Sequence, residues 1–429
     1  MDPLEVLADI SDFVLQHFSA KELLTLTEVH PFWNEVIGSS VKAMSKIKVL
    51  INVYRSNSEI LESASSDLVK SSRKYQEIEM LDMSGLISTT KSVHRILIEP
   101  ERKWKSITLK HVTLDSLEQL ETAFNIIEKS LETLEIDEIS FRFPAIGVNF
   151  TNKTFPKLKV LRLKHHNWNS FHHAFTRCQN LNEFRMCSSK ISSEPVLEIL
   201  KRNVNLNILE VSTAVFYQIF SSNDEFWQKN NLKLNTFEAH FTSHTSHDVE
   251  KIRKNFLNFL NTQAESLETL VIDRWMGVEV LKLIFHLPKL KNLTIDGLKN
   301  LMLMPNWRNF SLKLNKSIQN LTFYDVHPEF QIVKSLIDAT PNLTHLEMHS
   351  MDQQVMEYLS ENSKDLKALK LRAMEATDFS SRHLFPKLQE FAICIVFANQ
   401  EDAMKLIPEE GRNSLVKLLL LQSDYTFLH

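Results

Sequence analysis

An apolar triplet with the spacing Leu-x-x-Leu-x-Leu recurs about a dozen times between Trp104 and the C-terminus. Successive copies begin between 22 residues (366 to 388) and 33 residues (234 to 267) apart, a range that overlaps the period of about 20–29 residues typical of leucine-rich repeats. The copies begin at Trp104, Leu131, Leu158, Leu181, Leu206, Leu234, Leu267, Leu290, Ile318, Leu343, Leu366, Leu388 and Leu415. This repetition predicts a solenoid, in which each repeat packs only against its neighbours.

The spacing inside each copy predicts a strand. The fourth and sixth positions are two residues apart, so in an extended segment both side chains lie on one face. We expect this face to be buried and the third, fifth and seventh positions to be exposed on a concave recognition surface. Between the copies, amphipathic segments such as Leu117–Ile127, Phe256–Leu260 and Ile332–Ile337 predict helices on the convex side. The predicted fold class is therefore α/β, with parallel strands.

Proline marks the entry to four of the copies, at Pro156, Pro288, Pro341 and Pro386. Proline cannot continue a helix and favours an extended residue before it, so these positions predict a switch from helix to strand. None of the copies has asparagine or cysteine at its ninth position, where leucine-rich repeats usually carry one. We therefore expect loops of uneven length and an irregular curvature.

Composition and charge exclude several classes of protein. The 429 residues are 43% hydrophobic and 24% charged, as in a folded chain, and the net charge of −4 comes with no polybasic run, so no nucleic-acid partner is expected. The three cysteines lack Cys-x-x-Cys spacing, which favours a reducing compartment, the cytoplasm and/or the nucleus. No signal peptide or membrane span is visible, so no membrane partner is expected.

No motif indicates an enzyme. With six glycines, the chain has no Gly-rich phosphate loop, no Gly-x-Ser-x-Gly elbow and no His-Glu-x-x-His helix, so we expect neither catalytic residues nor a cofactor. Two groups of histidines invite a metal-site hypothesis, and they are His165, His166, His172 and His173, and His240, His244 and His247. The first group mixes a strand position with loop or helix positions, and no carboxylate or cysteine completes the second convincingly, so surface histidines are the better interpretation and no metal is expected.

The first 45 residues contain no triplet and have helical spacing throughout, so they predict a separate helical module. Ser19 followed by Glu22 is the arrangement of a capping box, which marks the start of a helix. A module of this size buries only part of its apolar surface, so the remainder should meet a partner or the end of the solenoid.

The segment from Ser19 to Val36 resembles the second half of an F-box, and residues 3–7, Pro-Leu-Glu-Val-Leu, resemble its opening. The resemblance covers about the first forty residues. Asp2 stands where the family has leucine, His30 stands where it has cysteine, and about four extra residues lie between the two halves. Four residues are close to one helical turn, so the insertion is compatible with a longer first helix. An alternative alignment through Val14 shortens the gap but loses Pro3.

This resemblance implies a function. F-box proteins bind the Skp adaptor of a cullin-based ubiquitin ligase, and many hold their substrate on leucine-rich repeats. Carried over by position, the adaptor-binding candidates are Pro3, Leu7, Leu23, Leu24, Val29 and Trp33. The implied function is that of a substrate receptor, whose partners are the adaptor, through it a cullin, and an unknown protein substrate.

The resemblance also suggests how the chain is divided. Residues 1–45 would be the F-box-like module, residues 46–103 atypical capping repeats, and residues 104–429 the solenoid. A serine-rich stretch, Ser56 to Ser72, could instead be a mobile linker.

The concave face offers candidates for binding the substrate. Five acids at exposed strand positions predict an acidic tract, Glu210, Glu238, Asp273, Asp296 and Glu347. Such a tract would select a basic patch on the substrate. Alternatively, exposed charges simply keep the sheet soluble. The alternative function is a non-catalytic repeat scaffold or inhibitor, in which the N-terminal helices only cap the repeats.

Overall fold

A computed structural model gives the fold of the chain. The structure describes residues 13–29, 31–53, 62–63, 66–68, 70–71, 73, 75–82, 90–99, 103–142, 153–164, 171–187, 193–221, 224–229, 231–240, 249–272, 277–298, 311–324, 329–371, 385, 387–395 and 417–422. The chain divides into two compact units, Met1–Leu206 and Asn207–His429. The sequence does not mark this boundary, because the triplet continues across it.

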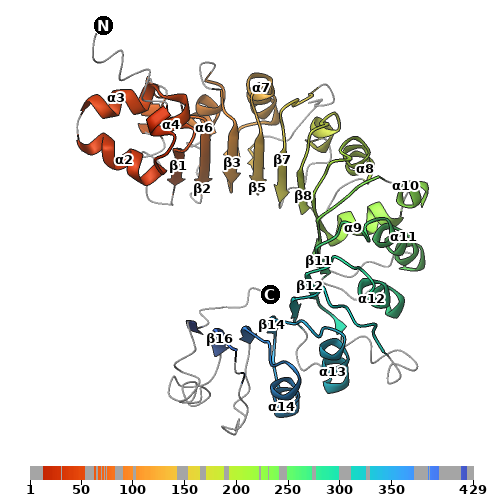
Figure 1. Cartoon of the computed structure of the whole chain (residues 1–429). Coiled ribbons are helices and arrows are strands. Elements are labelled where there is room, and N and C mark those ends of the chain that lie inside the picture. The colour runs from red at the N-terminus through yellow and green to blue at the C-terminus, as the bar shows by residue number, and fades with distance from the viewer. Residues whose placement is uncertain are drawn as a thin grey trace. The chain divides into compact units, whose positions relative to one another are not determined.

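The first unit contains a parallel sheet (Figure 1). Its described strands lie in sequence order and are β1 (Lys48–Val53), β2 (Glu77–Asp82), β3 (Ser106–Lys110), β5 (Thr133–Asp137), β7 (Val160–Lys164) and β8 (Glu183–Cys187). A short parallel pair, β4 (Thr113–Leu114) and β6 (Ser140–Phe141), follows two of these strands. β1 and β2, which precede the first triplet, therefore belong to the same sheet as the triplet strands.

The second unit repeats the arrangement. Its described strands also pair in parallel and in sequence order, and they are β9 (Ile208–Ser212), β10 (Thr236–His240), β11 (Thr269–Ile272), β12 (Asn292–Ile295), β13 (Asn320–Phe323), β14 (His345–Met348), β15 (Ala368–Leu371), β16 (Glu390–Ile395) and β17 (Lys417–Gln422). The predicted α/β class built on a parallel sheet is confirmed.

Every triplet quoted from the sequence contributes one strand, which begins two residues after the first apolar position. In β5, for example, Leu134 and Ile136 are buried, while their neighbours along the strand are half-buried. Leu134 pairs in register with Leu161 of β7, so equivalent leucines stack from strand to strand. In β5 the predicted alternation holds, because a strand has a period of two and only one of its faces is covered. It does not hold in β3 and β9, where Thr108, Glu210 and Ser212 are buried as well.

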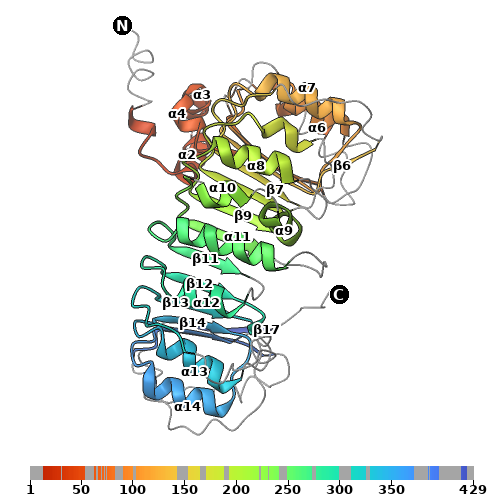
Figure 2. The ribbon, with the colours of Figure 1, turned by 90° about the vertical axis from the view of Figure 1, so that its right-hand side faces the viewer.

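Helices cover that face, and Figure 2 shows those of the second unit succeeding one another along its strands. The described helices of the first unit are α2 (Ala20–Val29), α3 (Pro31–Ser39), α4 (Val41–Met44), α6 (Thr90–Leu97), α7 (Leu117–Ile127), the 3₁₀ helix η2 (Phe171–Phe175) and α8 (Ser193–Arg202). Those of the second unit are α9 (Thr213–Ser221), α10 (Asp224–Lys229), α11 (Val249–Thr262), α12 (Val278–Ile284), α13 (Phe330–Asp338) and α14 (Gln353–Asn362). None of these helices is long and apolar enough to span a membrane.

The prolines lie where the sequence placed the switch from helix to strand. Pro156, Pro288 and Pro341 are in turns directly before their strands, and Pro386 lies outside the described residues. One detail differs from expectation, because Phe155, which precedes a proline, has a φ of 40° rather than an extended one. Phe155 is wholly buried against Phe124, with ring centroids 5.3 Å apart, so packing outweighs the local preference.

An aromatic core fills the second unit beside β10. Helix α9 follows β9 directly, and α10 comes after it; no triplet predicts either helix. Their side chains Phe216, Phe220 and Trp227 pack against α11. The Phe220 and Trp227 rings stack at 4.2 Å, and the indole N–H of Trp227 donates to the Ile219 carbonyl over 2.8 Å. Two helices therefore pack between the copies that begin at Leu206 and Leu234, where most other copies are followed by one described helix.

Candidate functional site

Helix α2 begins at the predicted capping box. The Ser19 backbone N–H donates to Glu22 Oε2 over 2.6 Å, and the Glu22 backbone N–H donates to Ser19 Oγ over 3.3 Å. The Ser19 hydroxyl donates to the same carboxylate over 2.7 Å. These hydrogen bonds hold the pKa of the Glu22 carboxyl below its ordinary value. The capping box is confirmed, and it fixes the first residue of the helix that carries three of the adaptor-binding candidates.

Leu23 faces inward from α2 and is 0% exposed. Its neighbours form the core of the N-terminal module, which consists of Leu15, Leu23, Ile37, Ala43, Met44 and Ile47. Trp33 packs against this core as a partly buried side chain. A side chain with no exposed area cannot contact a partner, so the structure corrects Leu23 from an adaptor-facing residue to a core residue. The physical reason is that a short helix is stable only when one face is buried.

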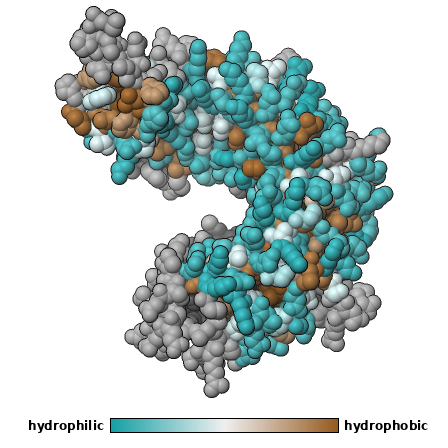
Figure 3. All heavy atoms as spheres, viewed as in Figure 1, coloured by the Kyte–Doolittle hydropathy of each residue, from teal (hydrophilic) through white to brown (hydrophobic). Residues whose placement is uncertain are grey.

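Leu24 and Val29 point outward from the same helix. Leu24 is 45% exposed and Val29 is 69% exposed, and two further apolar side chains of the module, Phe13 and Val14, are also exposed. Figure 3 shows this apolar surface over the N-terminal helices. Pro3 and Leu7 lie outside the described residues. α2 thus carries large apolar side chains that the module leaves uncovered.

Lys46 holds the turn that precedes α2. Its Nζ donates to the carbonyl oxygens of Phe18, over 2.6 Å, and of Gln16. These carbonyls lie between the first described helical turn and α2. Carbonyl groups at the end of a helical turn have no N–H partner within the helix, so they accept hydrogen bonds from elsewhere. Lys46 therefore ties the end of the module to its beginning and fixes the orientation of α2.

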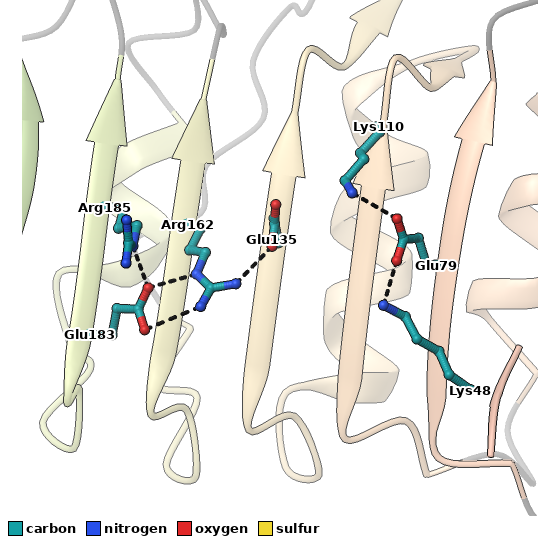
Figure 4. A network of polar contacts seen from close by, with 7 residues as sticks. All are labelled: Lys48, Glu79, Lys110, Glu135, Arg162, Glu183 and Arg185. Carbon is teal, nitrogen blue, oxygen red and sulfur yellow. Dashed lines mark hydrogen bonds and ion pairs between the residues drawn. The ribbon is translucent and has the colours of Figure 1, made fainter. Parts of the chain in front are cut away.

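The open face of the first sheet, away from its helices, carries a network of ion pairs (Figure 4). Glu79 on β2 pairs with Lys48 and, over 2.7 Å, with Lys110. Further along the sheet, Arg162 on β7 bridges two carboxylates, Glu135 at 3.0 Å and Glu183 at 2.7 Å. Anions and cations thus alternate across successive strands.

Glu183 is the most buried carboxylate of this network. Arg162 donates to both of its oxygens, over 2.7 and 3.2 Å, and Arg185 donates to Oε1. Burial alone raises the pKa of Glu183, but the hydrogen bonds from the two arginines outweigh it, so the pKa lies below its ordinary value. The same contact with Glu183 raises the pKa of Arg162. The network keeps these groups charged and satisfies them internally.

On the open face of the second sheet, the described members of the predicted acidic tract do not form one continuous row. Glu210 and Glu238 are cross-strand neighbours, but Glu210 is only 6% exposed. In the same cross-strand row the next three side chains are uncharged, namely Val271, Thr294 and Thr322, and Glu347 follows on β14. The register of the strands therefore breaks the tract into separate acids.

The other two predicted acids do not restore the tract. Asp273 lies outside the described residues. Asp296 follows β12, and its Oδ1 accepts the backbone N–H of Gly297 over 2.7 Å, so this carboxylate stabilises the turn after the strand.

Sequence reasoning missed a second row of polar side chains on this face. Asn292 donates through Nδ2 to Thr269 Oγ1 over 2.9 Å, and Asn320 donates through Nδ2 to Asn292 Oδ1. The Asn-Leu-Thr sequence shared by β12 and β13 was the available signal, because alternate positions of a strand share a face.

The structure gives no support to a metal site. Among the residues that it describes, no group of three or more histidine, cysteine, aspartate or glutamate side chains is arranged to hold a metal ion. Most of the histidines considered from the sequence, His165, His166, His244 and His247, lie outside those residues.

Comparison with known proteins gives no family. No family model matches the chain, and no curated protein matches it. A solved structure described as "Crystal structure of a TDR receptor" is similar over 81% of this chain and 62% of that chain, with 11% sequence identity and a TM-score of 0.27. The chain thus spans less than two thirds of the length of that neighbour. A likeness this weak carries no argument about function.

Proposed function

We propose that this chain is the substrate receptor of a Skp/cullin/F-box ubiquitin ligase. In this proposal the N-terminal helices are an F-box that binds the Skp-type adaptor, and the strands and helices that follow are a leucine-rich-repeat solenoid that holds a protein substrate. The observation that carries the proposal is the exposure of Leu24 and Val29, 45% and 69%, on a helix that Leu23 anchors to the core of the module. Both residues match adaptor-facing positions of the family that the segment resembles.

The repeats support the second half of the proposal. Parallel strands in register leave an open face on which side chains of alternate positions are displayed, and this is where repeat proteins bind their partners. The order of the two parts along the chain, helical module first and repeats after, is the order that many F-box proteins have.

The receptor would perform no bond chemistry and would need no cofactor. Holding a substrate beside a charged ubiquitin carrier raises the effective concentration of the reacting groups, which is sufficient to accelerate transfer. Such a receptor would act in the cytoplasm and/or the nucleus, without nucleic-acid or membrane partners.

Co-purification with a Skp-type adaptor tests the proposal. We expect the full chain to co-elute with the adaptor, and the double variant Leu24→Asp/Val29→Asp to weaken the association at least tenfold, since burial of each apolar side chain is worth about 1.5–3 kcal/mol. Leu50→Asp is the matched control, because Leu50 is 62% exposed on β1 and lies outside the F-box resemblance. An unchanged association in the double variant, or no association in the wild type, contradicts the proposal.

A second candidate is a repeat scaffold or inhibitor that acts outside any ligase. The observation that favours it is the burial of Leu23 in one core with Ile47, with Trp33 packed against that core, because this is the contact expected of helices that cap the sheet. In that case Leu24→Asp/Val29→Asp would leave every partner association unchanged.

A further inference from the structure

Lysines gather along one edge of the second sheet, in the turns that lead into its strands. They come from three repeats: Lys289 precedes β12, Lys313 and Lys316 precede β13, and Lys364 and Lys367 precede β15. All five residues are exposed, and we call them the lysine rim. The sequence shows no polybasic run here, because the repeats bring together lysines that lie far apart along the chain.

Hydrogen bonds join these turns into one continuous edge. The Gln319 backbone N–H donates to the Lys291 carbonyl over 2.9 Å, and Asn342 Nδ2 donates to the Lys316 carbonyl over 2.7 Å. Backbone hydrogen bonds join the turn before β15 to the turn before β14 in the same way. The strands β12 to β15 are neighbours in the sheet, so three steps of about 4.8 Å make this edge about 14 Å long.

The acids of neighbouring turns do not neutralise the lysine rim. Glu268 pairs with Lys291 over 2.8 Å, and Asp365 pairs with Lys387. None of the five rim lysines forms an ion pair with a residue that the structure describes. The pKa of Glu268 lies below its ordinary value, first through the hydrogen bond from Lys291, and the charge of Lys289 adds to that effect. The edge therefore carries more positive charge than its own acids balance.

An exposed leucine lies within the lysine rim. Leu314 is 59% exposed and is flanked by two of the rim lysines. The buried Asn315 fixes this turn, because its Nδ2 donates to the Leu287 carbonyl over 2.9 Å and its Oδ1 accepts the Ser317 backbone N–H over 2.9 Å. A turn fixed in this way loses little freedom when a partner covers Leu314.

We propose that the lysine rim binds an acidic polypeptide segment that places one apolar side chain on Leu314. Each ammonium group offers three hydrogen-bond donors on a flexible stem, which suits the mobile carboxylates of such a segment. Covering the leucine adds a contact that carboxylates alone do not supply. At about 3.3 Å per residue, an extended segment of about five residues covers the edge. The inference does not depend on the ligase proposal, since α2 and the lysine rim belong to different units.

A nucleic acid suits the lysine rim less well. Proteins that bind single strands combine cations for the backbone with aromatic side chains on which bases stack. The turns 285–291, 311–319, 340–344 and 363–367 contain no exposed Phe, Tyr or Trp, and no arginine for bidentate phosphate contacts. Leu314 also offers an apolar contact that a phosphate backbone does not use.

Peptide binding tests the inference. The probe is a fluorescent peptide with blocked ends, in which three glutamates stand on each side of one leucine, and the readout is fluorescence anisotropy with the full chain. We expect binding that weakens as the salt concentration rises. Replacing every glutamate by glutamine should weaken it about tenfold or more. Replacing the leucine by asparagine should weaken it about threefold, since the leucine is only partly covered.

Variants of the chain locate the site. Lys289→Glu/Lys316→Glu should weaken binding of the acidic peptide about tenfold or more, because it replaces attraction by repulsion. The matched control is Lys129→Glu/Lys254→Glu, which changes the net charge equally at two exposed lysines outside the rim. It should change binding by less than about twofold, because salt screens distant charges. Circular dichroism checks that each variant is folded.

Leu314→Asn provides the decisive comparison. This variant should no longer distinguish the peptide with leucine from the peptide with asparagine. The inference is overturned by an absence of binding, by equal losses in the rim variant and its control, or by a leucine preference that persists in Leu314→Asn. Tighter binding of a single-stranded RNA of equal charge would also overturn it. The adaptor assay is independent, since it depends on Leu24 and Val29.

Discussion

The side chain of Asn203 accepts a hydrogen bond from the backbone N–H of Leu181, over 2.8 Å. This bond joins the residue that follows α8 to the first residue of the triplet that forms β8. Its Nδ2 also donates to the carbonyls of Cys178, at 2.9 Å, and Ile199, at 2.7 Å. Asn203 is 1% exposed, so no water replaces these bonds if the side chain is removed. One buried carboxamide thus satisfies three backbone groups at the junction of two repeats.

Asn203→Ala should lower the free energy of unfolding by about 2–4 kcal/mol, since it leaves the Leu181 N–H and the Cys178 carbonyl without this partner, whereas the Ile199 carbonyl still accepts the backbone N–H of residue 203. The measurement is urea unfolding of the full chain followed by circular dichroism. Asn180→Ala is the matched control, because Asn180 is exposed and donates one hydrogen bond, of 2.7 Å, to the Pro156 carbonyl. It should cost about 1 kcal/mol or less. Equal losses in the two variants would contradict the role assigned to Asn203.

A left-handed turn recurs after the strands and offers a second prediction. His111, Glu138 and Gly297 occupy the same, eighth, position of their triplets and have φ values of 54°, 55° and 77°. Only glycine adopts this conformation without steric cost, which is about 1–2 kcal/mol for other residues. Glu138→Gly should therefore raise the free energy of unfolding by up to about 1 kcal/mol, after allowance for the greater freedom of glycine in the unfolded chain.

The comparison variant is Glu138→Val, which should be destabilising, because a branched side chain is least tolerant of positive φ. Thermal unfolding of the two variants beside the wild type gives the order of stability. If the valine variant were as stable as the glycine variant, strain at this turn would not be the cause.

The triplet predicted the strands well because a buried face leaves a direct mark on the sequence. Leu134 and Ile136 are buried as expected, since a shift by one residue would expose both. The role of the ninth position of each triplet was not predictable in the same way. Val112 and Ile139 occupy it as wholly buried or nearly buried apolar residues, and the buried carboxamide of Asn203 lies instead before the leucine of its copy.

The candidate surfaces were predicted less well, for a physical reason. Helical spacing shows that Leu23 and Leu24 are both apolar, but it does not show which of them faces the module's own core, because that depends on Ile37 and Ile47 from elsewhere in the chain. The neighbours of each predicted acid were not predictable for a similar reason. Which side chains adjoin Glu238 depends on the register between strands that are about thirty residues apart in the sequence. The next strand places Val271 beside Glu238, and the strand after it places Thr294 beside Val271.

Cys178 gives a prediction about reactivity. The side chain is wholly buried, and burial raises the pKa of its thiol to about 12. Because the thiolate is the reactive form, the native chain should not be modified at Cys178 by a maleimide at neutral pH, whereas the chain unfolded in urea should be. Peptide mapping by mass spectrometry measures this, with the less buried Cys187 as an internal comparison. Rapid modification of native Cys178 would show that this part of the core opens readily.

Glu183 should make the stability of the chain depend on acidity. Its pKa lies below the ordinary value of 4.5, because hydrogen bonds from Arg162 and Arg185 outweigh the effect of burial. A carboxyl group whose folded pKa is lowered stabilises the fold fully above its unfolded pKa, and this contribution is lost as the pH falls through the folded value. Glu183→Gln should therefore be less stable than the wild type at neutral pH, and the difference should shrink below about pH 4.5. Urea unfolding at a series of pH values measures the difference, with the exposed Glu361→Gln of α14 as the control. Curves for Glu183→Gln and the wild type that stay parallel down to acid pH would show that the arginine contacts do not stabilise the ionised carboxylate.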